Sequence, residues 1–142
     1  MAELMTNTAR MLDFFEKWGV DFDTLCASFR EYFTPDCIWE NAGCPTVHGP
    51  EDAIDTILRP CREGALGMET MAVTMRHIAE ADGVVFTERI DDLVRADGSV
   101  VLTVAVTGVT EFAEDGRIRH WREYADPTAF LALLAGSPST SV

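Results

Sequence analysis

The sequence predicts an α+β fold in which helices pack on one face of a curved sheet. Apolar residues recur at helical spacing in the first third of the chain, whereas strand-like segments separated by regularly spaced Asp-Gly turns follow from about residue 68. Because the helices come first and consecutive strands follow, the two kinds of element form separate layers instead of alternating units. The 142 residues are enough for one core, so we expect residues 1–142 to form a single domain.

Two helices are predicted in the first third of the chain. Apolar and aromatic side chains recur there every three or four residues in two runs, which Gly19 and Val20 separate. The first run contains Met11, Leu12, Phe14, Phe15 and Trp18, and the second contains Phe22, Leu25, Phe29, Tyr32 and Phe33. Pro35 is expected to stop the second helix, because the residue before a proline disfavours helical geometry.

A short strand and a third helix are predicted next. Residues 37–41 have strand character and lead into a loop at residues 43–45. The segment GPEDAIDTILRPCREG, residues 49–64, carries the signals of a helix. Pro50 suits the first helical position, acidic residues fill the first turn, and Gly64 lies near the end.

Four strands and a closing helix are predicted in the second half of the chain. Asp-Gly pairs mark three turns between segments rich in strand formers, a pattern typical of an antiparallel meander. The predicted strands are residues 71–79, 83–95, 99–113 and 117–125. A helix is expected at residues 127–135, followed by a disordered tail at residues 136–142.

Composition and net charge indicate which kinds of binding partner the protein does not have. A formal net charge of −13 gives a surface that repels phosphate backbones, so nucleic acid is excluded as a partner. No apolar run approaches the roughly 20 residues of a membrane helix, and the N-terminal segment lacks the pattern of a signal peptide. We therefore expect a cytoplasmic protein that does not enter a membrane. The cysteines at positions 26, 37, 44 and 61 match no zinc pattern, so we expect free thiols and no metal site.

Charged residues occur on strand faces where burial is expected. Side chains alternate between the two faces of a strand, so Arg89 and Asp91 share one face with Thr87. The next strand, VVLTVAVTGV, is almost entirely apolar residues and Thr, which predicts that both of its faces are covered. A cation and an anion in such a place persist only when they are paired. A solvated cross-strand ion pair on an exposed sheet face is the alternative.

The last strand and the short early strand repeat this pattern. In GRIRHWREYAD, Arg119, Trp121 and Glu123 share one face, so Trp121 and Glu123 point together. Trp39 and Asn41 likewise share one face of residues 37–41. Three strands therefore place polar groups beside aromatic side chains. The alternatives are a solvated carboxylate, tryptophans of the core and an asparagine of a turn.

Three short segments hold these polar and aromatic residues together: IWEN at 38–41, FTERIDDL at 86–93 and HWREYAD at 120–126. They resemble the signature segments of the limonene-1,2-epoxide hydrolase family. Its near relatives are the SnoaL-like polyketide cyclases, within the nuclear transport factor 2-like superfamily. The resemblance continues through REYFTPDCIWEN, GPEDAI, HIAEADGVVFTERID and WREYADPTAF, in one order, and covers about residues 29–130.

The resemblance implies both a shape and a mechanism. The implied shape is a cone in which a strongly curved mixed sheet and N-terminal helices surround a deep apolar pocket, usually in a homodimer without metal or cofactor. By motif, Asp91 is the general acid, Arg89 bridges two carboxylates and Glu123 is the general base. Asn41 holds the attacking water, and Trp39 stands at the position of a second water-holding residue.

Two of these positions depart from the family pattern. Glu123 stands where the family usually has Asp, and the extra methylene moves the carboxylate by about an ångström, which can cost roughly a hundredfold in rate. Trp39 stands where the family usually has Tyr, and its N–H can donate a hydrogen bond but cannot accept one. The site is therefore altered, or adapted to another substrate.

The expected function is hydrolysis of a small hydrophobic epoxide to a vicinal diol, by simultaneous acid and base catalysis and without a cofactor. The expected pocket lining is Phe15, Trp18, Met68, Leu93, Val104, Val106, Trp121 and Phe130. One alternative is an isomerase of the ketosteroid type or a SnoaL-like cyclase, in which Asp91 or Glu123 moves a carbon-bound proton. Another is a protein that binds small apolar ligands without turnover.

Overall fold

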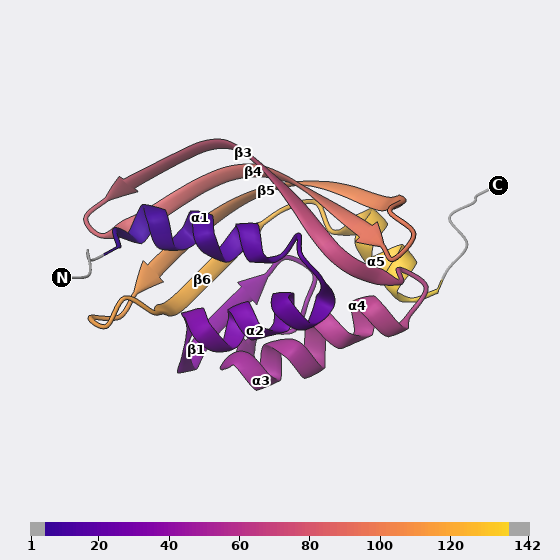
Figure 1. Cartoon of the computed structure of the whole chain (residues 1–142), viewed down its shortest axis with the longest axis horizontal. Coiled ribbons are helices and arrows are strands. Elements are labelled where there is room, and N and C mark those ends of the chain that lie inside the picture. Colours follow the sequence, from indigo (N-terminus) through magenta and orange to yellow (C-terminus); the bar gives the residue numbers. More distant parts are fainter. Residues whose placement is uncertain (1–4, 137–142) are drawn as a thin grey trace.

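The computed structural model describes residues 5–136 and shows helices packed on one face of a curved sheet, as predicted (Figure 1). The helices are α1 (Asn7–Lys17), α2 (Phe22–Tyr32), α3 (Pro50–Ala53), the π-helical segment η1 (Ile54–Leu58), α4 (Arg59–Glu63) and α5 (Thr128–Leu134). The strands are β1 (Phe33–Asn41), β2 (Val47–His48), β3 (Met68–Ala81), β4 (Val84–Arg95), β5 (Val100–Phe112) and β6 (Ile118–Tyr124). The predicted tail beyond Gly136 lies outside the described residues.

The sheet combines an antiparallel meander with one parallel strand pair. Within the described residues it has six strands in the order β2-β1-β6-β5-β4-β3. Strands β3 to β6 form the predicted antiparallel meander. Strand β1 returns the early part of the chain to the sheet by pairing parallel with β6. The sheet is therefore mixed and open, and its curvature wraps it around the helices (Figure 1).

The first two helices follow the predicted pattern. Thr6 caps α1 by accepting a hydrogen bond from the Ala9 N–H, and Asp21 caps α2 by accepting one from the Thr24 N–H. Their apolar faces enter the core, where Phe14 is fully buried among aromatic rings. In the part of the chain that the structure describes, no helix is long and apolar enough to cross a membrane.

The segment between α2 and α3 differs from the prediction. The second helix ends at Tyr32 instead of near Pro35, and β1 begins at Phe33 instead of Cys37. Pro35 lies inside β1, where the pairing with β6 changes register between Phe33 and Ile38. Proline is tolerated at such an irregularity, because no ladder hydrogen bond is required of its missing N–H.

The third helix has the predicted bounds, but its π-helical turn, the strand β2 and the start of β3 differ from the prediction. The third helix is one helical run from Pro50 to Glu63 that passes through a π-helical turn, and Pro60, which lacks an N–H donor, follows that turn. The short strand β2 was not expected, and β3 begins at Met68 rather than at residue 71.

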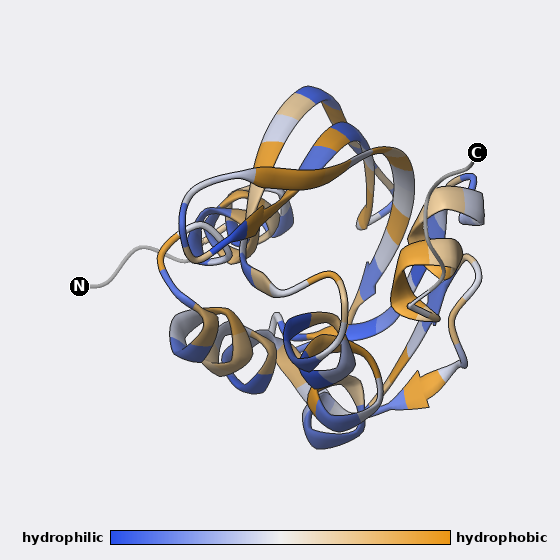
Figure 2. Cartoon of the chain, turned by 90° about the vertical axis from the view of Figure 1, so that its right-hand side faces the viewer, coloured by the Kyte–Doolittle hydropathy of each residue, from blue (hydrophilic) through white to orange (hydrophobic). Residues whose placement is uncertain are grey.

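The predicted alternation of side chains holds along β4, and Figure 2 shows hydrophobic and hydrophilic residues alternating along the strands. Strand β5 departs from the prediction that both of its faces are covered, because Thr103, Ala105 and Thr107 are exposed on its outer face in the single chain.

Arg119 of β6 also departs from its predicted face. It is exposed, because β6 carries one extra residue there in its pairing with β5, whereas Trp121 and Glu123 point inward.

Candidate active site

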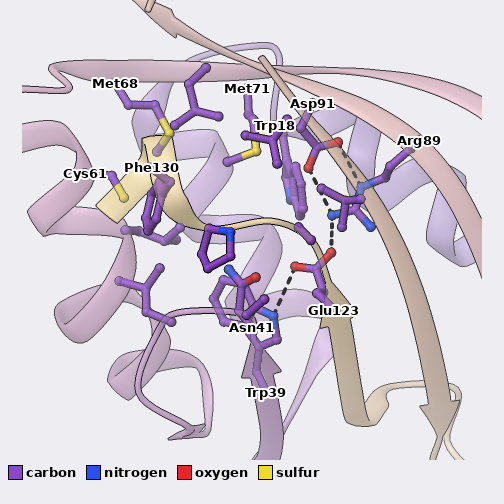
Figure 3. Close-up of a pocket in the computed structure, with 18 of the residues that line it drawn as sticks. Trp18, Trp39, Asn41, Cys61, Met68, Met71, Arg89, Asp91, Glu123 and Phe130 are labelled. Atoms are coloured by element: carbon purple, nitrogen blue, oxygen red, sulfur yellow. Dashed lines mark hydrogen bonds and ion pairs between the residues drawn. The ribbon is translucent and has the colours of Figure 1, made fainter. Parts of the chain in front are cut away.

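An apolar cavity of about 80 Å³ lies between the helices and the inner face of the sheet. This volume is several times what one water molecule needs. Six of the eight side chains expected to line a pocket lie on its wall, namely Trp18, Met68, Leu93, Val104, Val106 and Phe130. Polar side chains gather on the side opposite Met68 and Phe130 (Figure 3). The cavity therefore has one polar end and one apolar end.

Strand pairing brings the polar residues to one end of the cavity. Arg89 and Asp91 point inward from β4, where they lie opposite Val106 and Val104 of β5. On the other side of β5, Glu123 of β6 lies opposite Asn41 of the parallel strand β1. Segments that are far apart in the sequence thus deliver their polar side chains to the same inner face of the sheet.

One arginine contacts two carboxyl groups in this cluster. Arg89 Nε donates to Asp91 Oδ1 at 2.9 Å, and Arg89 Nη2 donates to Asp91 Oδ2 at 3.0 Å. The same Nη2 also donates to Glu123 Oε2. The Arg89 side chain is therefore a bridge between the two carboxyls (Figure 3).

Burial makes this cluster sensitive to its protonation state. Arg89, Asp91 and Glu123 are only 1%, 4% and 5% exposed. Burial raises the pKa of Asp91 and the pKa of Glu123 above their ordinary values, and the charge on Arg89 offsets this only in part. Burial opposes the charge on Arg89, but the two carboxyls together outweigh it and raise the pKa of Arg89.

These opposing effects favour one shared proton. With Arg89 charged, the cluster is neutral when one carboxyl is ionised and the other is protonated. A second ionised carboxyl would leave an uncompensated buried charge, which costs several kcal/mol. The two carboxyls therefore titrate as a coupled pair, and one of them can act as an acid while the other acts as a base.

The raised pKa of Asp91 predicts a pH-dependent effect on stability. A carboxyl whose pKa is higher in the folded state stabilises the fold below its unfolded pKa of about 3.8, and this stabilisation is lost as pH rises through the folded pKa. We therefore expect the melting temperature of Asp91→Asn, relative to wild type, to increase between pH 4 and pH 8. The measurement is thermal unfolding followed by circular dichroism at both pH values.

Asp97 provides a control of opposite sign for this experiment. Its exposed carboxyl accepts hydrogen bonds from Ser99, which lower its pKa. Asp97→Asn should therefore lose melting temperature relative to wild type as pH rises through this lowered pKa, mostly below pH 4, and should not gain any between pH 4 and pH 8. A relative melting temperature of Asp91→Asn that is the same at both pH values, or lower at pH 8, would contradict the raised pKa of Asp91.

The Trp39 side chain contacts the Glu123 carboxyl. Trp39 Nε1 donates to Glu123 Oε1 at 3.2 Å, and the indole ring stacks on Trp121 with ring centroids 4.9 Å apart. Both oxygens of Glu123 therefore already accept a hydrogen bond, one from Trp39 and one from Arg89. Each carboxylate oxygen has a second acceptor site, so Glu123 can still accept a hydrogen bond from a water molecule.

Two of the residues expected to line the pocket lie behind its wall instead. The Phe15 ring packs against the Arg89 guanidinium, with Cζ 4.6 Å from the ring centroid. Trp121 is fully buried under Trp39. Both rings lie against the Arg89 guanidinium and are not part of the cavity wall. Asn41 does lie on the wall, next to Glu123.

The cavity also has wall residues that were not expected from the sequence. They come mainly from helices, whose position against the sheet no strand pattern predicts. They include Leu25, Phe29, Ile57, Leu58, Cys61 and Met71. Burial raises the pKa of the Cys61 thiol to about 12, so this thiol stays protonated and is a poor nucleophile. Among residues 5–136, no group of three or more His, Cys, Asp or Glu side chains is arranged to hold a metal ion.

Comparison with known proteins identifies the family. The family model described as limonene-1,2-epoxide hydrolase catalytic domain matches residues 11–135. The chain belongs to this family. This family member is 35% identical to epoxide hydrolase EphG of Mycobacterium tuberculosis over 117 residues. The match covers 82% of this chain and 70% of EphG.

Solved structures extend the comparison. An LEH-like epoxide hydrolase from M. tuberculosis is 25% identical, with a TM-score of 0.63, and the match covers 92% of this family member and 90% of that chain. A structure described as a SnoaL-like polyketide cyclase from Jannaschia sp. has a TM-score of 0.68 at 17% sequence identity. The match covers 96% of this chain and 100% of that chain. At that identity the likeness concerns the fold alone.

Proposed function

We propose that this protein hydrolyses a small hydrophobic epoxide to a vicinal diol in one step and without a cofactor. The observation that carries the proposal is the bridge that Arg89 forms between Asp91 and Glu123 at the polar end of an apolar cavity. Opening an epoxide without a covalent intermediate requires an acid and a base at the same time. A pair of carboxyls that shares one proton meets this requirement.

The proposed roles follow from the chemistry of the residues. Protonated Asp91 gives its proton to the epoxide oxygen as the C–O bond breaks, and ionised Glu123 takes a proton from the water that attacks the carbon. Arg89 stays charged and holds both carboxyls, while the Asn41 amide, on the cavity wall, holds the attacking water. The site is reset when the proton gained by Glu123 is released and Asp91 is protonated again.

The cavity wall supports a neutral, hydrophobic substrate. Apart from the cluster at its polar end, the wall consists mainly of aliphatic, aromatic and sulfur-containing side chains, among them Leu93, Met68 and Phe130. Such a wall stabilises the apolar groups of a substrate by removing them from water. The epoxide oxygen, the polar atom of the substrate, then faces the buried acid at the polar end of the cavity.

A panel of substrates tests the proposed function. Purified protein is incubated with small apolar epoxides and, separately, with steroid and polyketide ketones, and products are identified by mass spectrometry. The proposal predicts diols from at least one class of epoxide. Rearranged ketones without diols would instead support a proton-transfer enzyme, and saturable binding without any product would support a ligand-binding protein.

Trp39→Tyr is expected to preserve epoxide hydrolysis within about tenfold or to increase it. A tyrosine keeps an aromatic ring against Trp121 and replaces the indole N–H by a hydroxyl that can both donate and accept, as a water-holding group must. The measurement is kcat/KM on the best epoxide of the panel, with Trp39→Phe as the control that has a ring but no hydrogen-bonding group. A loss above about tenfold in Trp39→Tyr would show that Trp39 shapes the cavity for its own substrate.

We also propose that the protein is a homodimer. The outer face of the sheet supports this proposal, because β5 exposes Ala105 between Thr103 and Thr107 and no helix covers them among residues 5–136. Sedimentation at micromolar concentration should give the mass of a dimer, and a monomer mass would contradict the proposal.

A further inference from the structure

A glycine interrupts the inner face of the sheet directly behind the polar cluster. Gly108 of β5 lies opposite Thr87 of β4 and Glu123 of β6. A Cβ at this position would lie 2.9 Å from Thr87 Oγ1, 3.3 Å from Arg89 Nη1 and 3.4 Å from Trp121 Nε1. Glycine inside a strand often marks a place where other groups approach the backbone closely. Here three polar atoms from the two neighbouring strands converge on the space that the absent side chain leaves.

Each of these three atoms is deeply buried. Thr87 is 2% exposed, Arg89 is 1% exposed and Trp121 is fully buried. None of the three atoms has a hydrogen-bond partner within residues 5–136. Arg89 Nη1 is also the one nitrogen of this guanidinium that neither Asp91 nor Glu123 contacts. A buried donor without an acceptor destabilises the folded state, and more so when it is charged, so native proteins satisfy nearly all such groups.

Hydrogen-bonding chemistry assigns the roles in this trio. The guanidinium of Arg89 and the indole N–H of Trp121 can only donate, so neither can satisfy the other. The Thr87 hydroxyl can both donate and accept. Among the three atoms nearest to the Gly108 position it is therefore the acceptor.

We propose that Thr87 and Gly108 are positioning residues that fix the Arg89 guanidinium in place. Gly108 leaves an open space between Nη1 and the Thr87 hydroxyl, and one bound water molecule there accepts a hydrogen bond from Nη1 and donates one to Thr87 Oγ1. Neither residue lies on the cavity wall, so both act through Arg89. Because Nη1 is fixed on this side, the guanidinium keeps the orientation in which Nε and Nη2 donate to the two carboxyls. The catalytic meaning of this arrangement rests on the proposed function, but the arrangement itself can be tested without turnover.

The test measures the carboxyl pair directly. Carbon-13 NMR titrations of the side-chain carboxyls of Asp91 and Glu123 are compared in wild type, Thr87→Val and Thr87→Ser. Thr87→Val keeps the shape but removes the acceptor, so Arg89 is held less firmly and lowers the two carboxyl pKa values less. We expect the apparent pKa values of the pair to rise by about half a unit or more in Thr87→Val. Thr87→Ser, which keeps the hydroxyl, should restore values within about 0.2 units of wild type.

Thr110→Val is the matched control. Thr110 is fully buried on the same face of β5, and its hydroxyl also lacks a partner in the described part of the chain. It lies two residues beyond Gly108, about 7 Å along the strand, and its hydroxyl is not among the three atoms nearest to the Gly108 position. Its removal should leave the titration unchanged. The other titratable groups near the pair, the Asp92 carboxyl and the Cys44 thiol, are present in every variant.

Several results would overturn the proposal. An unchanged titration in Thr87→Val, or an equal shift in Thr110→Val, would show that Thr87 has no special relation to Arg89. Should Thr87→Val fail to fold, Gly108→Ala provides the second variant, because its methyl group would fill the space between Thr87 Oγ1, 2.9 Å away, and Nη1, 3.3 Å away, and should also raise the pair's pKa values. A high-resolution crystal structure should show a water molecule between Nη1 and Thr87 Oγ1, and the lack of any water in contact with both atoms would overturn the proposal. Lack of epoxide turnover in wild type would overturn the proposed function and leave these results intact.

Discussion

Asp91→Asn is expected to lower kcat by about a hundredfold or more while substrate binding changes little. The asparagine keeps the shape of the side chain and can donate a hydrogen bond, but it cannot release a proton to the epoxide oxygen. The proton of an acid is needed only as the C–O bond breaks, so its loss appears in the transition state and not in the ground state. The measurement is steady-state kinetics together with calorimetric binding of the same epoxide.

Asp92→Asn is the control for this experiment. Asp92 is the next residue of β4, points to the opposite face, and accepts a hydrogen bond from the hydroxyl of Thr103. Its replacement should leave kcat within a few-fold of wild type. If Asp91→Asn kept more than about a tenth of the wild-type kcat, Asp91 could not be the general acid.

Glu123→Gln is expected to lose turnover on a similar scale, about a hundredfold or more. The glutamine amide has the size of the carboxyl but cannot take a proton from water, and it also removes the negative charge of one of the two partners of Arg89. Glu123→Asp keeps a base, although it shortens the reach by one methylene, so it should be clearly more active than Glu123→Gln. Both rates are measured under single-turnover conditions, which separate the chemical step from product release.

Equal rates for the two Glu123 variants would exclude this residue as the base. Binding of the epoxide to each variant is the accompanying control, since a variant that binds normally and turns over slowly has lost chemistry and not structure. Melting temperatures complete the comparison, because both substitutions change a residue that is only 5% exposed.

Much of the fold could be predicted from the sequence, because its signals are local. The aromatic spacing in residues 7–32 and the Asp-Gly turns of the meander each specify one element and its neighbours. The start of β1 was not predicted, since Phe33 continues the helical spacing of α2 and Pro35 obscures the strand. The π-helical turn at Ile54–Leu58 likewise has no simple sequence signal.

The residues of the candidate site were predictable to a lesser extent. Strand parity puts Arg89 with Asp91, and Trp121 with Glu123, on shared faces, but it does not tell an inward face from an exposed one. A residue on the cavity wall cannot be told from one behind it by any local pattern, as Trp121 of β6 and Phe15 of α1 illustrate. Wall residues from helices depend on tertiary packing that no local pattern specifies. One signal was available and unused: Gly108, a glycine inside a strand of β-branched residues, indicates a close approach of other groups.

A single turnover in heavy-oxygen water, with enzyme in excess over epoxide, tests the central claim most directly. The claim is that water attacks the substrate itself while Asp91 and Glu123 only donate and accept protons. It predicts that the oxygen label appears in the diol and that neither carboxyl becomes labelled. Label recovered in the side chain of Asp91 or Glu123 would show that an ester had formed with the protein, and the one-step mechanism would then be wrong.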